Sequence, residues 1–215
     1  MQLITARHGV ALHDDIENFI RDRYETVYGA HVGRLAPHLI ANITSDGGVT
    51  CAAGLRTAAD GFACEVYLDV PVEKLIASNA RSIASSRDKI LEVTSLCSSS
   101  PSLSVSFLRD IALFGFRHGF EWSVFVATAR LRRLLTLLSF EPLTLATAAR
   151  ERMPNCELWG SYYDSNPVVM AVHRTTVAAI ALKVAAGPEQ CAALTCPLFA
   201  SFAASQAAAD KRHVA

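Results

Sequence analysis

The sequence lacks an excess of either charge. Its 215 residues contain 20 Lys and Arg against 20 Asp and Glu. This balance gives no sign of a surface dedicated to nucleic acid or to anionic lipid, so we expect no nucleic-acid partner. With 51% hydrophobic and 19% charged residues, the chain is also too apolar for intrinsic disorder. The composition favours a folded globular protein.

Long apolar runs and export signals are also missing. The most apolar stretch, residues 168–187, is interrupted by His173, Arg174 and Lys183, so we expect no transmembrane segment. The N-terminus has no basic region followed by an apolar one, which predicts a cytoplasmic protein of bacterial type without a signal peptide. The six cysteines include no CxxC pair, which favours free thiols over disulfides.

Familiar catalytic and cofactor motifs are absent. The chain contains no phosphate-binding GxxxxGK[ST], no dinucleotide-binding GxGxxG after a strand, no GxSxG and no HExxH. The seven histidines never pair at the spacing of metal ligands, so we expect no metal.

The first half of the chain predicts antiparallel strands. A strand over residues 2–7 precedes a helix that begins near Asp14 and ends at Tyr28, where apolar residues recur at helical spacing. Strands over residues 39–44 and 49–57 flank Asp46-Gly47, a hairpin signal. A third strand is predicted over residues 62–68, and a short helix from Pro71 to Ala80.

The second half predicts alternating strands and helices. Strands are expected over residues 90–96, 122–127 and 142–146, and helices over residues 103–118 and 129–139. This alternation implies parallel crossovers, with the strand at 90–96 beside the strand at 122–128. We also predict that these two strands splay apart at the ends nearest the cleft. Residues 157–163 and 168–173 could add late strands. The expected fold is therefore α/β, with a mixed sheet, antiparallel in its N-terminal half and parallel later, and helices on both faces. No linker divides a core over residues 1–175 from an Ala-rich helical extension over residues 176–215 that packs on it.

Glu92 is the most unusual residue of the predicted sheet. It lies within a strand among Leu91, Val93 and Leu96, where a carboxylate is costly to bury unless it is paired or functional. Arg56 is a similar exception in its own strand. The two charges could simply pair across the sheet. Alternatively, Glu92 accepts a proton in a cleft where Arg56 holds a substrate carboxylate or carbonyl.

A serine-rich loop follows the Glu92 strand. It leads into the start of a helix, where free backbone N–H groups could receive phosphate. Together with Glu92, this loop favours group transfer from a phosphopantetheine-type donor. Its residues are candidates for donor binding: Leu96, Cys97, Ser98, Ser99 and Ser100.

Several segments together resemble the thermostable hemolysin family. The similarity is collinear over about residues 15–172 and is carried by RDRYETVYGAHVGRLAPHLIA (21–41), AAGLR (52–56), EVYLDVPVEKLI (65–76), ILEVTSL (90–96), VFVATARLRRLLTLLSFEPLTLATA (124–148) and WGSYYDSNPVV (159–169). The order of elements in turn resembles that of GNAT-type acyltransferases, and most closely that of acyl-homoserine-lactone synthases.

The resemblance implies an N-acyltransferase that moves an acyl group from a thioester, either coenzyme A or the phosphopantetheine of a carrier protein, to a small-molecule amine. Glu92 is then the expected general base, and Tyr163 or a neighbour donates a proton to the leaving thiolate. The expected substrate-binding residues are Arg23, Tyr28, Arg56, Tyr162 and Asp164. The tyrosines and Asp164 could equally be ordinary strand and turn residues.

The loop departs from the GNAT pattern because residues 97–102 contain no glycine. Its N–H groups therefore cannot all turn toward a diphosphate, which favours an acyl or peptidyl carrier protein over free coenzyme A. Acidic carriers would dock on basic residues, of which Arg109, Arg117 and Arg130 to Arg133 are candidates. Two other classes stay open: a membrane-active protein, as the family name suggests, and a GNAT-like module that binds a ligand without turnover.

Overall fold

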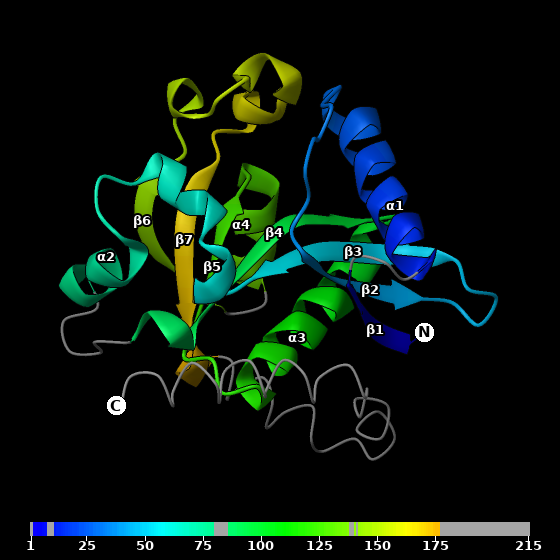
Figure 1. Ribbon diagram of the computed structural model, residues 1–215, viewed down its shortest axis with the longest axis horizontal. Helices are drawn as coiled ribbons and strands as arrows, with labels where there is room; N and C mark the ends of the chain where they lie inside the picture. The colour runs from blue at the N-terminus through cyan, green and yellow to red at the C-terminus, as the bar shows by residue number, and fades with distance from the viewer. Residues whose placement is uncertain (1, 8–10, 80–85, 138–139, 141, 177–215) are drawn as a thin grey trace.

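A seven-stranded mixed sheet forms the centre of the protein. The computed structural model describes residues 2–7, 11–79, 86–137, 140 and 142–176 (Figure 1). The strand order is β1-β2-β3-β4-β5-β7-β6, and β4 and β5 are parallel while all other neighbours are antiparallel. The strands are β1 (Gln2–Arg7), β2 (His38–Ile43), β3 (Val49–Arg56), β4 (Ile90–Ser98), β5 (Trp122–Ala127), β6 (Leu143–Thr147) and β7 (Val168–His173). The expected α/β class and hairpin are confirmed.

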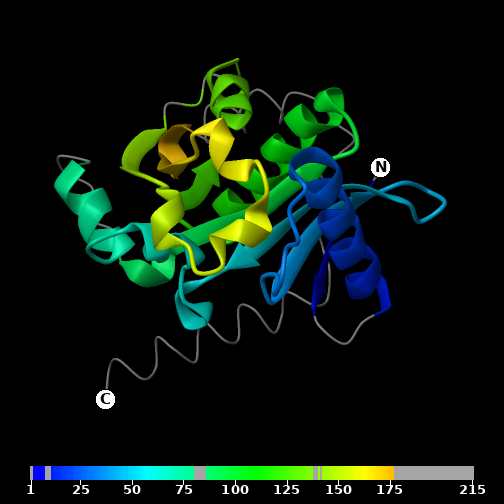
Figure 2. The same ribbon diagram turned by 90° about the horizontal axis from the view of Figure 1, so that it is seen from above.

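Helices cover both faces of the sheet, as expected. Helix α1 (Ala11–Tyr28) buries Ile16, Ile20 and Tyr24 on one face, while α3 (Pro101–Arg117) buries Phe107 and Ile111 on the other. Helix α4 (Ala129–Leu137) lies on the same side as α3, and Figure 2 shows the two opposite α1. Helix α2 (Val72–Asn79) packs near β6. Asp14, the expected start of α1, lies instead in its first turn.

The predicted third strand over residues 62–68 is wrong. Residues Ala63–Tyr67 form a short 3₁₀ helix, η2. The edge of β3 that a third hairpin strand would need is already occupied by β4. In addition, Cys64 and Tyr67 are both buried, and this i, i+3 spacing suits a 3₁₀ turn.

The predicted parallel pairing of the late strands is confirmed only for β4 and β5. Strand β7 lies between β5 and β6 and is antiparallel to both. The continuous apolar run of β7 has its four central residues buried, which suits an interior strand, whereas β6 is partly exposed and lies at the edge.

The predicted strand over residues 157–163 is also wrong. Two 3₁₀ turns, Cys156–Trp159 and Tyr162–Ser165, replace it, with Gly160 between them at φ 51°.

The Ala-rich extension predicted for residues 176–215 lies, beyond Thr176, outside the described residues. In the described part of the chain, no helix is both long and apolar enough to cross a membrane. Its four cysteines, Cys51, Cys64, Cys97 and Cys156, carry free thiols, as expected.

Candidate functional site

The site begins where β4 and β5 separate. The parallel pairing runs from Ile90 opposite Trp122 to Val93 opposite Phe125, and it ends there. On the other side of β4, Thr94 pairs with Gly54 but Cys97 pairs with Ala52, so two residues of β4 face one of β3. Such a bulge bends a strand and increases its twist. The predicted splay of these two parallel strands is therefore confirmed.

Ser95 holds the bulge in an unusual backbone conformation. Its φ is +50°, a region that side chains other than glycine seldom adopt. Gly54 on β3 faces the same bulge, and a Cβ there would lie 2.7 Å from the Cβ of Ala36. The segment before β2 therefore packs directly against β3 at Gly54, where a side chain would collide with Ala36.

A cavity of about 530 Å³ passes through the gap between the two strands. Residues from both faces of the sheet line it, so it runs from the side of α1 to the side of α3 and α4. The second side is largely apolar, and we call it the apolar arm; it is lined by Phe107, Leu108, Ile111, Ala112, Phe125, Leu131, Leu134, Leu135 and Phe140.

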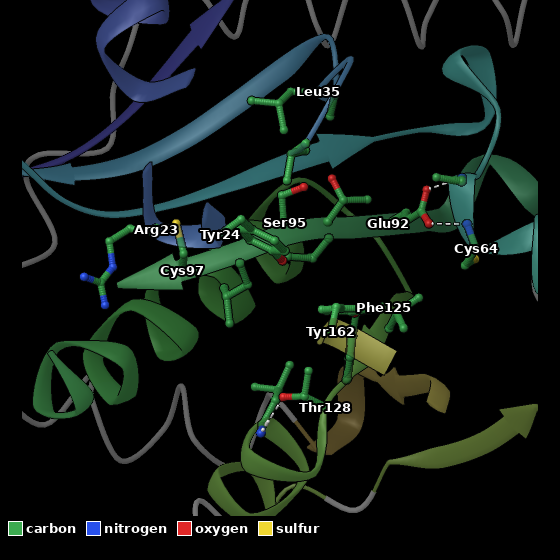
Figure 3. Close-up of a pocket in the computed structure, with 18 of the residues that line it drawn as sticks. Arg23, Tyr24, Leu35, Cys64, Glu92, Ser95, Cys97, Phe125, Thr128 and Tyr162 are labelled. Carbon is green, nitrogen blue, oxygen red and sulfur yellow. Dashed lines mark hydrogen bonds between the residues drawn. The ribbon is translucent and has the colours of Figure 1, made fainter. Parts of the chain in front are cut away.

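Glu92 lines the cavity opposite the loop that follows β4 (Figure 3). Its side chain is 1% exposed, and its two carboxylate oxygens accept hydrogen bonds from the backbone N–H groups of Ala63 at 2.6 Å and Cys64 at 2.7 Å. The N-terminal turn of η2 thus replaces the water that the carboxylate loses on burial. This contact is one that sequence patterns did not predict.

Burial raises the pKa of Glu92, while the two backbone hydrogen bonds and the Arg56 guanidinium act in the opposite direction. The expected pairing with Arg56 is loose. The two residues are partners across β3 and β4, but Arg56 Nε lies 4.0 Å from the carboxylate and donates instead to Gly61 O at 3.0 Å. A second nitrogen of Arg56 donates to Asp60 O. Glu92 is therefore held mainly by the backbone of η2.

Two arginines fix η2 in place. Arg87 donates to both carboxylate oxygens of Glu65, at 2.6 and 2.7 Å, and also to Glu73 on α2. Arg152 approaches from the C-terminal half and donates to Val66 O, Leu68 O and the Asp69 carboxylate. The N–H groups that face Glu92 are consequently preorganised by contacts on both sides of η2.

Four aromatic side chains form a wall of the cavity. Tyr162 lies at its centre, with ring centroids 5.3 Å from Tyr28, 5.3 Å from Trp159 and 6.2 Å from Tyr24. All four residues line the cavity. The wall joins the end of α1 to the turns at 156–165, and it includes the predicted Tyr28 and Tyr162. Tyr24 and Trp159 are not among the site residues expected from the sequence; Tyr24 has the spacing of the apolar residues of its helix.

Gly160 allows the two halves of the wall to meet. A Cβ at this position would clash with Tyr28 O and lie 2.9 Å from the carbonyl carbon of Gly29. The close approach is sealed by hydrogen bonds from Ser161 N to Tyr28 O at 2.8 Å and from His31 N to Leu158 O at 2.7 Å. The glycine in the WGSYYD segment is therefore required by backbone contact.

Tyr163 and Asp164 lie apart from the cavity lining. Tyr163 is buried, and its hydroxyl shares a 2.7 Å hydrogen bond with the hydroxyl of Tyr67, which does line the cavity. Burial raises the pKa of Tyr163. Asp164 is exposed. Adjacent residues of a 3₁₀ turn point in different directions, which separates these two from Tyr162.

The predicted donor loop lines the cavity along its whole length, from Leu96 through Ser100. Much of its hydrogen-bonding capacity is used internally. The Ser98 hydroxyl bonds to Ser100 O and to the Ser104 hydroxyl, and Ser99 N–H donates to Thr50 O. Burial raises the pKa of the Cys97 thiol to about 12, which favours the neutral thiol over the reactive thiolate.

The charge of the cavity lining is strongly positive. Among the described residues, Glu92 is its single Asp or Glu, and four arginines oppose it: Arg23, Arg34, Arg56 and Arg130. Arg23 and Arg56, which are expected to bind substrate, both line the cavity. This lining would attract an anionic ligand.

A mixed sheet whose two parallel central strands diverge around a cavity is the fold of GNAT-type acyltransferases. Solved structures with this likeness include the acyl-homoserine lactone synthase LasI, with 8% identity and a TM-score of 0.53 over 80% of this chain and 89% of that one. BjaI, a CoA-dependent acyl-homoserine lactone synthase solved with SAM and isopentyl-CoA, has 13% identity and a TM-score of 0.55 over 86% and 88%. FeeM, an N-acyl amino acid synthase from uncultured soil microbes, has 12% identity and a TM-score of 0.53 over 82% and 98%. At these identities the likeness establishes the fold.

Sequence comparison identifies the family. Residues 7–178 match the thermostable hemolysin family, and the chain belongs to it. No curated protein gave a significant match.

Proposed function

We propose that the protein is an N-acyltransferase that moves an acyl group from a thioester to an amine. The observation that carries this proposal is the cavity through the divergence of β4 and β5, with the apolar arm on one side of the sheet and Glu92 on the other. An acyl chain and a polar acceptor are ligands of opposite character, and a cavity of this shape offers each a separate compartment. BjaI, an acyl-homoserine lactone synthase, and FeeM, an N-acyl amino acid synthase, are enzymes of this general kind.

The apolar arm indicates an acyl group longer than acetyl. Leu131, Leu134 and Leu135 of α4 line this part of the cavity together with Phe107 and Ile111 of α3. Burying a methylene group contributes about 0.8 kcal/mol, so a chain of several carbons gains affinity here and an acetyl group does not.

Glu92 is the proposed general base. The amine nitrogen attacks the thioester carbonyl, forming the C–N bond as the C–S bond breaks, and the thiolate leaves. Glu92 takes the proton that the nitrogen loses and can return it to the thiolate, so protons balance. Burial that raises the pKa of Glu92 makes it a stronger base, and the bonds from Ala63 and Cys64 fix its orientation. Donation by Tyr163 stays a prediction; its hydroxyl would act through Tyr67.

The donor is proposed to be an acyl carrier protein in preference to coenzyme A. The internal hydrogen bonds of Ser98 and Ser99 add to the absence of glycine as a reason why this loop suits a diphosphate poorly. Of the arginines expected to dock a carrier, four are exposed: Arg109, Arg117, Arg130 and Arg133. Arg132 is committed to Ala127 O and Asn166 O. Both donor types are made in the cytoplasm, the location expected from the sequence.

The test is thiol release from matched acyl-carrier and acyl-CoA donors with a panel of amines, comparing the native protein with Glu92→Gln. General-base catalysis contributes about 10²–10⁴-fold, so we expect a loss in that range. The amide NH₂ of Gln would oppose a backbone N–H of η2 and cost about 1–3 kcal/mol of stability, so folding is checked by urea unfolding. Glu17→Gln is the matched control, because the half-buried Glu17 carboxylate accepts a hydrogen bond from Arg21 but does not line the cavity.

An amine that is already unprotonated at the assay pH, such as hydroxylamine, separates chemistry from folding. It needs less base assistance, so it should recover part of the activity of folded Glu92→Gln. A loss smaller than tenfold in the variant, or no recovery with hydroxylamine, would refute the assignment of Glu92.

A further inference from the structure

Arg23 is a cation without a counterion on the wall of the cavity. Its side chain is half-buried, and its Nε is fully buried with no hydrogen-bond partner. Among the residues that the structure describes, no acidic side chain pairs with it. By contrast Arg21, two residues earlier on α1, is paired with Glu17 at 2.8 Å. A partly desolvated guanidinium with an unused donor is costly unless a ligand supplies an acceptor.

The position of Arg23 is at the open end of the splay. Figure 3 shows its guanidinium extending past Cys97 at the end of β4, away from Glu92. Its charge acts on the Cys97 thiol, whose pKa it lowers against the effect of burial. Arg23 therefore stands beside the loop at 97–100 that leads into α3.

Arg130 approaches the same end from the other strand. It lies in the first turn of α4, directly after β5, is exposed, and lines the cavity. Burial raises the pKa of the Tyr28 hydroxyl, and the charge of Arg130 acts to lower it. The Cys97 thiol acts on the same hydroxyl and raises its pKa. Arg23 and Arg130 therefore both line the cavity at the end where Cys97 and Tyr28 lie.

We infer that Arg23 and Arg130 form a phosphate site for the donor. In this site the arginine side chains bind the phosphate in place of the backbone N–H groups of a glycine-rich loop. This inference rests on the proposed function, since it assumes a phosphopantetheine donor. The two guanidinium groups suit one phosphate, because each can donate two parallel hydrogen bonds to its oxygens. The internal bonding of Ser98 and Ser99 leaves this role to the arginines. With the phosphate at the mouth, the thioester lies deeper in the splay, between the apolar arm and Glu92.

The test is calorimetric binding of two inert ligands, S-octyl-phosphopantetheine and S-octyl-pantetheine, which differ only in the phosphate. We expect the native protein to bind the phosphorylated ligand about tenfold or more tightly, the least that one hydrogen bond to a charged group contributes. In Arg23→Met this ratio should fall close to one, and in Arg130→Met it should fall severalfold. The matched control Arg21→Met should keep the native ratio, because Arg21 is outside the cavity lining.

The outcomes separate the two proposals. Equal binding of both ligands by the native protein, or an unchanged ratio in folded Arg23→Met, would overturn the phosphate site alone. Binding of neither ligand would overturn the proposed function and the phosphate site with it. Circular dichroism and urea unfolding of each variant establish that it is folded before binding is measured.

Discussion

Replacing Gly160 with alanine should damage the site by displacing one half of the aromatic wall. The new Cβ would meet Tyr28 O and the carbonyl carbon of Gly29, and both are backbone atoms of the helix end that cannot rotate away. Gly160 also has φ 51° and ψ −126°, a conformation that costs a side chain about 1–3 kcal/mol. The hydrogen bonds Ser161 N to Tyr28 O and His31 N to Leu158 O would lengthen or break, at about 1 kcal/mol each.

The expected total is a loss of about 3–5 kcal/mol in the free energy of unfolding, which for a chain of this size lowers Tm by about 6–20 °C. Differential scanning calorimetry measures it, and intrinsic Trp fluorescence reports whether Trp159 has moved. Gly33→Ala is the matched control, because Gly33 also lines the cavity but has open space around its Cβ position and no positive φ. If Gly160→Ala lies within about 0.5 kcal/mol of Gly33→Ala, the argument from backbone contact is wrong.

Two further substitutions test the supports of η2 and the apolar arm. The Arg87 guanidinium lowers the pKa of Glu65 in the folded protein. The pair therefore stabilises the fold fully above the pKa of Glu65 in the unfolded chain, about 4.3. This stabilisation is lost as the pH falls through the lower pKa that Glu65 has in the folded protein. Arg87→Met should therefore lower the free energy of unfolding, measured with urea, by about 1–2 kcal/mol at pH 7 and by much less near pH 3. An equal loss at both pH values would contradict the pairing. Ala112→Phe places a large side chain in the apolar arm. The ratio of turnover with long acyl donors to turnover with short ones should therefore fall at least tenfold relative to Ala112→Ser. An unchanged ratio would mean that the acyl chain binds elsewhere.

The elements around the divergence were predictable because local patterns determine them. The apolar run Trp122–Ala127 and the helix before it require a parallel neighbour for β4, and these features are visible without tertiary information. Glu92 and Arg56 are cross-strand partners, which was one of the two alternatives that the sequence left open for them. Arg23, Tyr28 and Tyr162 also reach the cavity, although they come from segments far apart in the chain.

The segments that sequence reasoning assigned wrongly are those whose conformation depends on distant side chains. Residues 62–68 are apolar enough for a strand, but Glu92, Arg87 and Arg152 bind their backbone or side chains and select a 3₁₀ turn instead. Residues 157–163 have the aromatic content of a strand, and the contact of Gly160 with the end of α1 bends them. No local pattern encodes these partners.

The attachment of η2 by Arg152 has a consequence for the order of folding. Its three bonds to Val66, Leu68 and Asp69 span 83 to 86 residues of sequence, and the aromatic wall joins the turns at 156–165 to the end of α1. Contacts of such long sequence separation have a high loop-closure entropy cost and therefore form late in folding. We expect the hairpin of β2 and β3 and its packing with α1 to form first, and the carboxylate environment of Glu92 to be completed only when the chain has been synthesised past Tyr162. A nascent chain released earlier would have much of its sheet but no cavity.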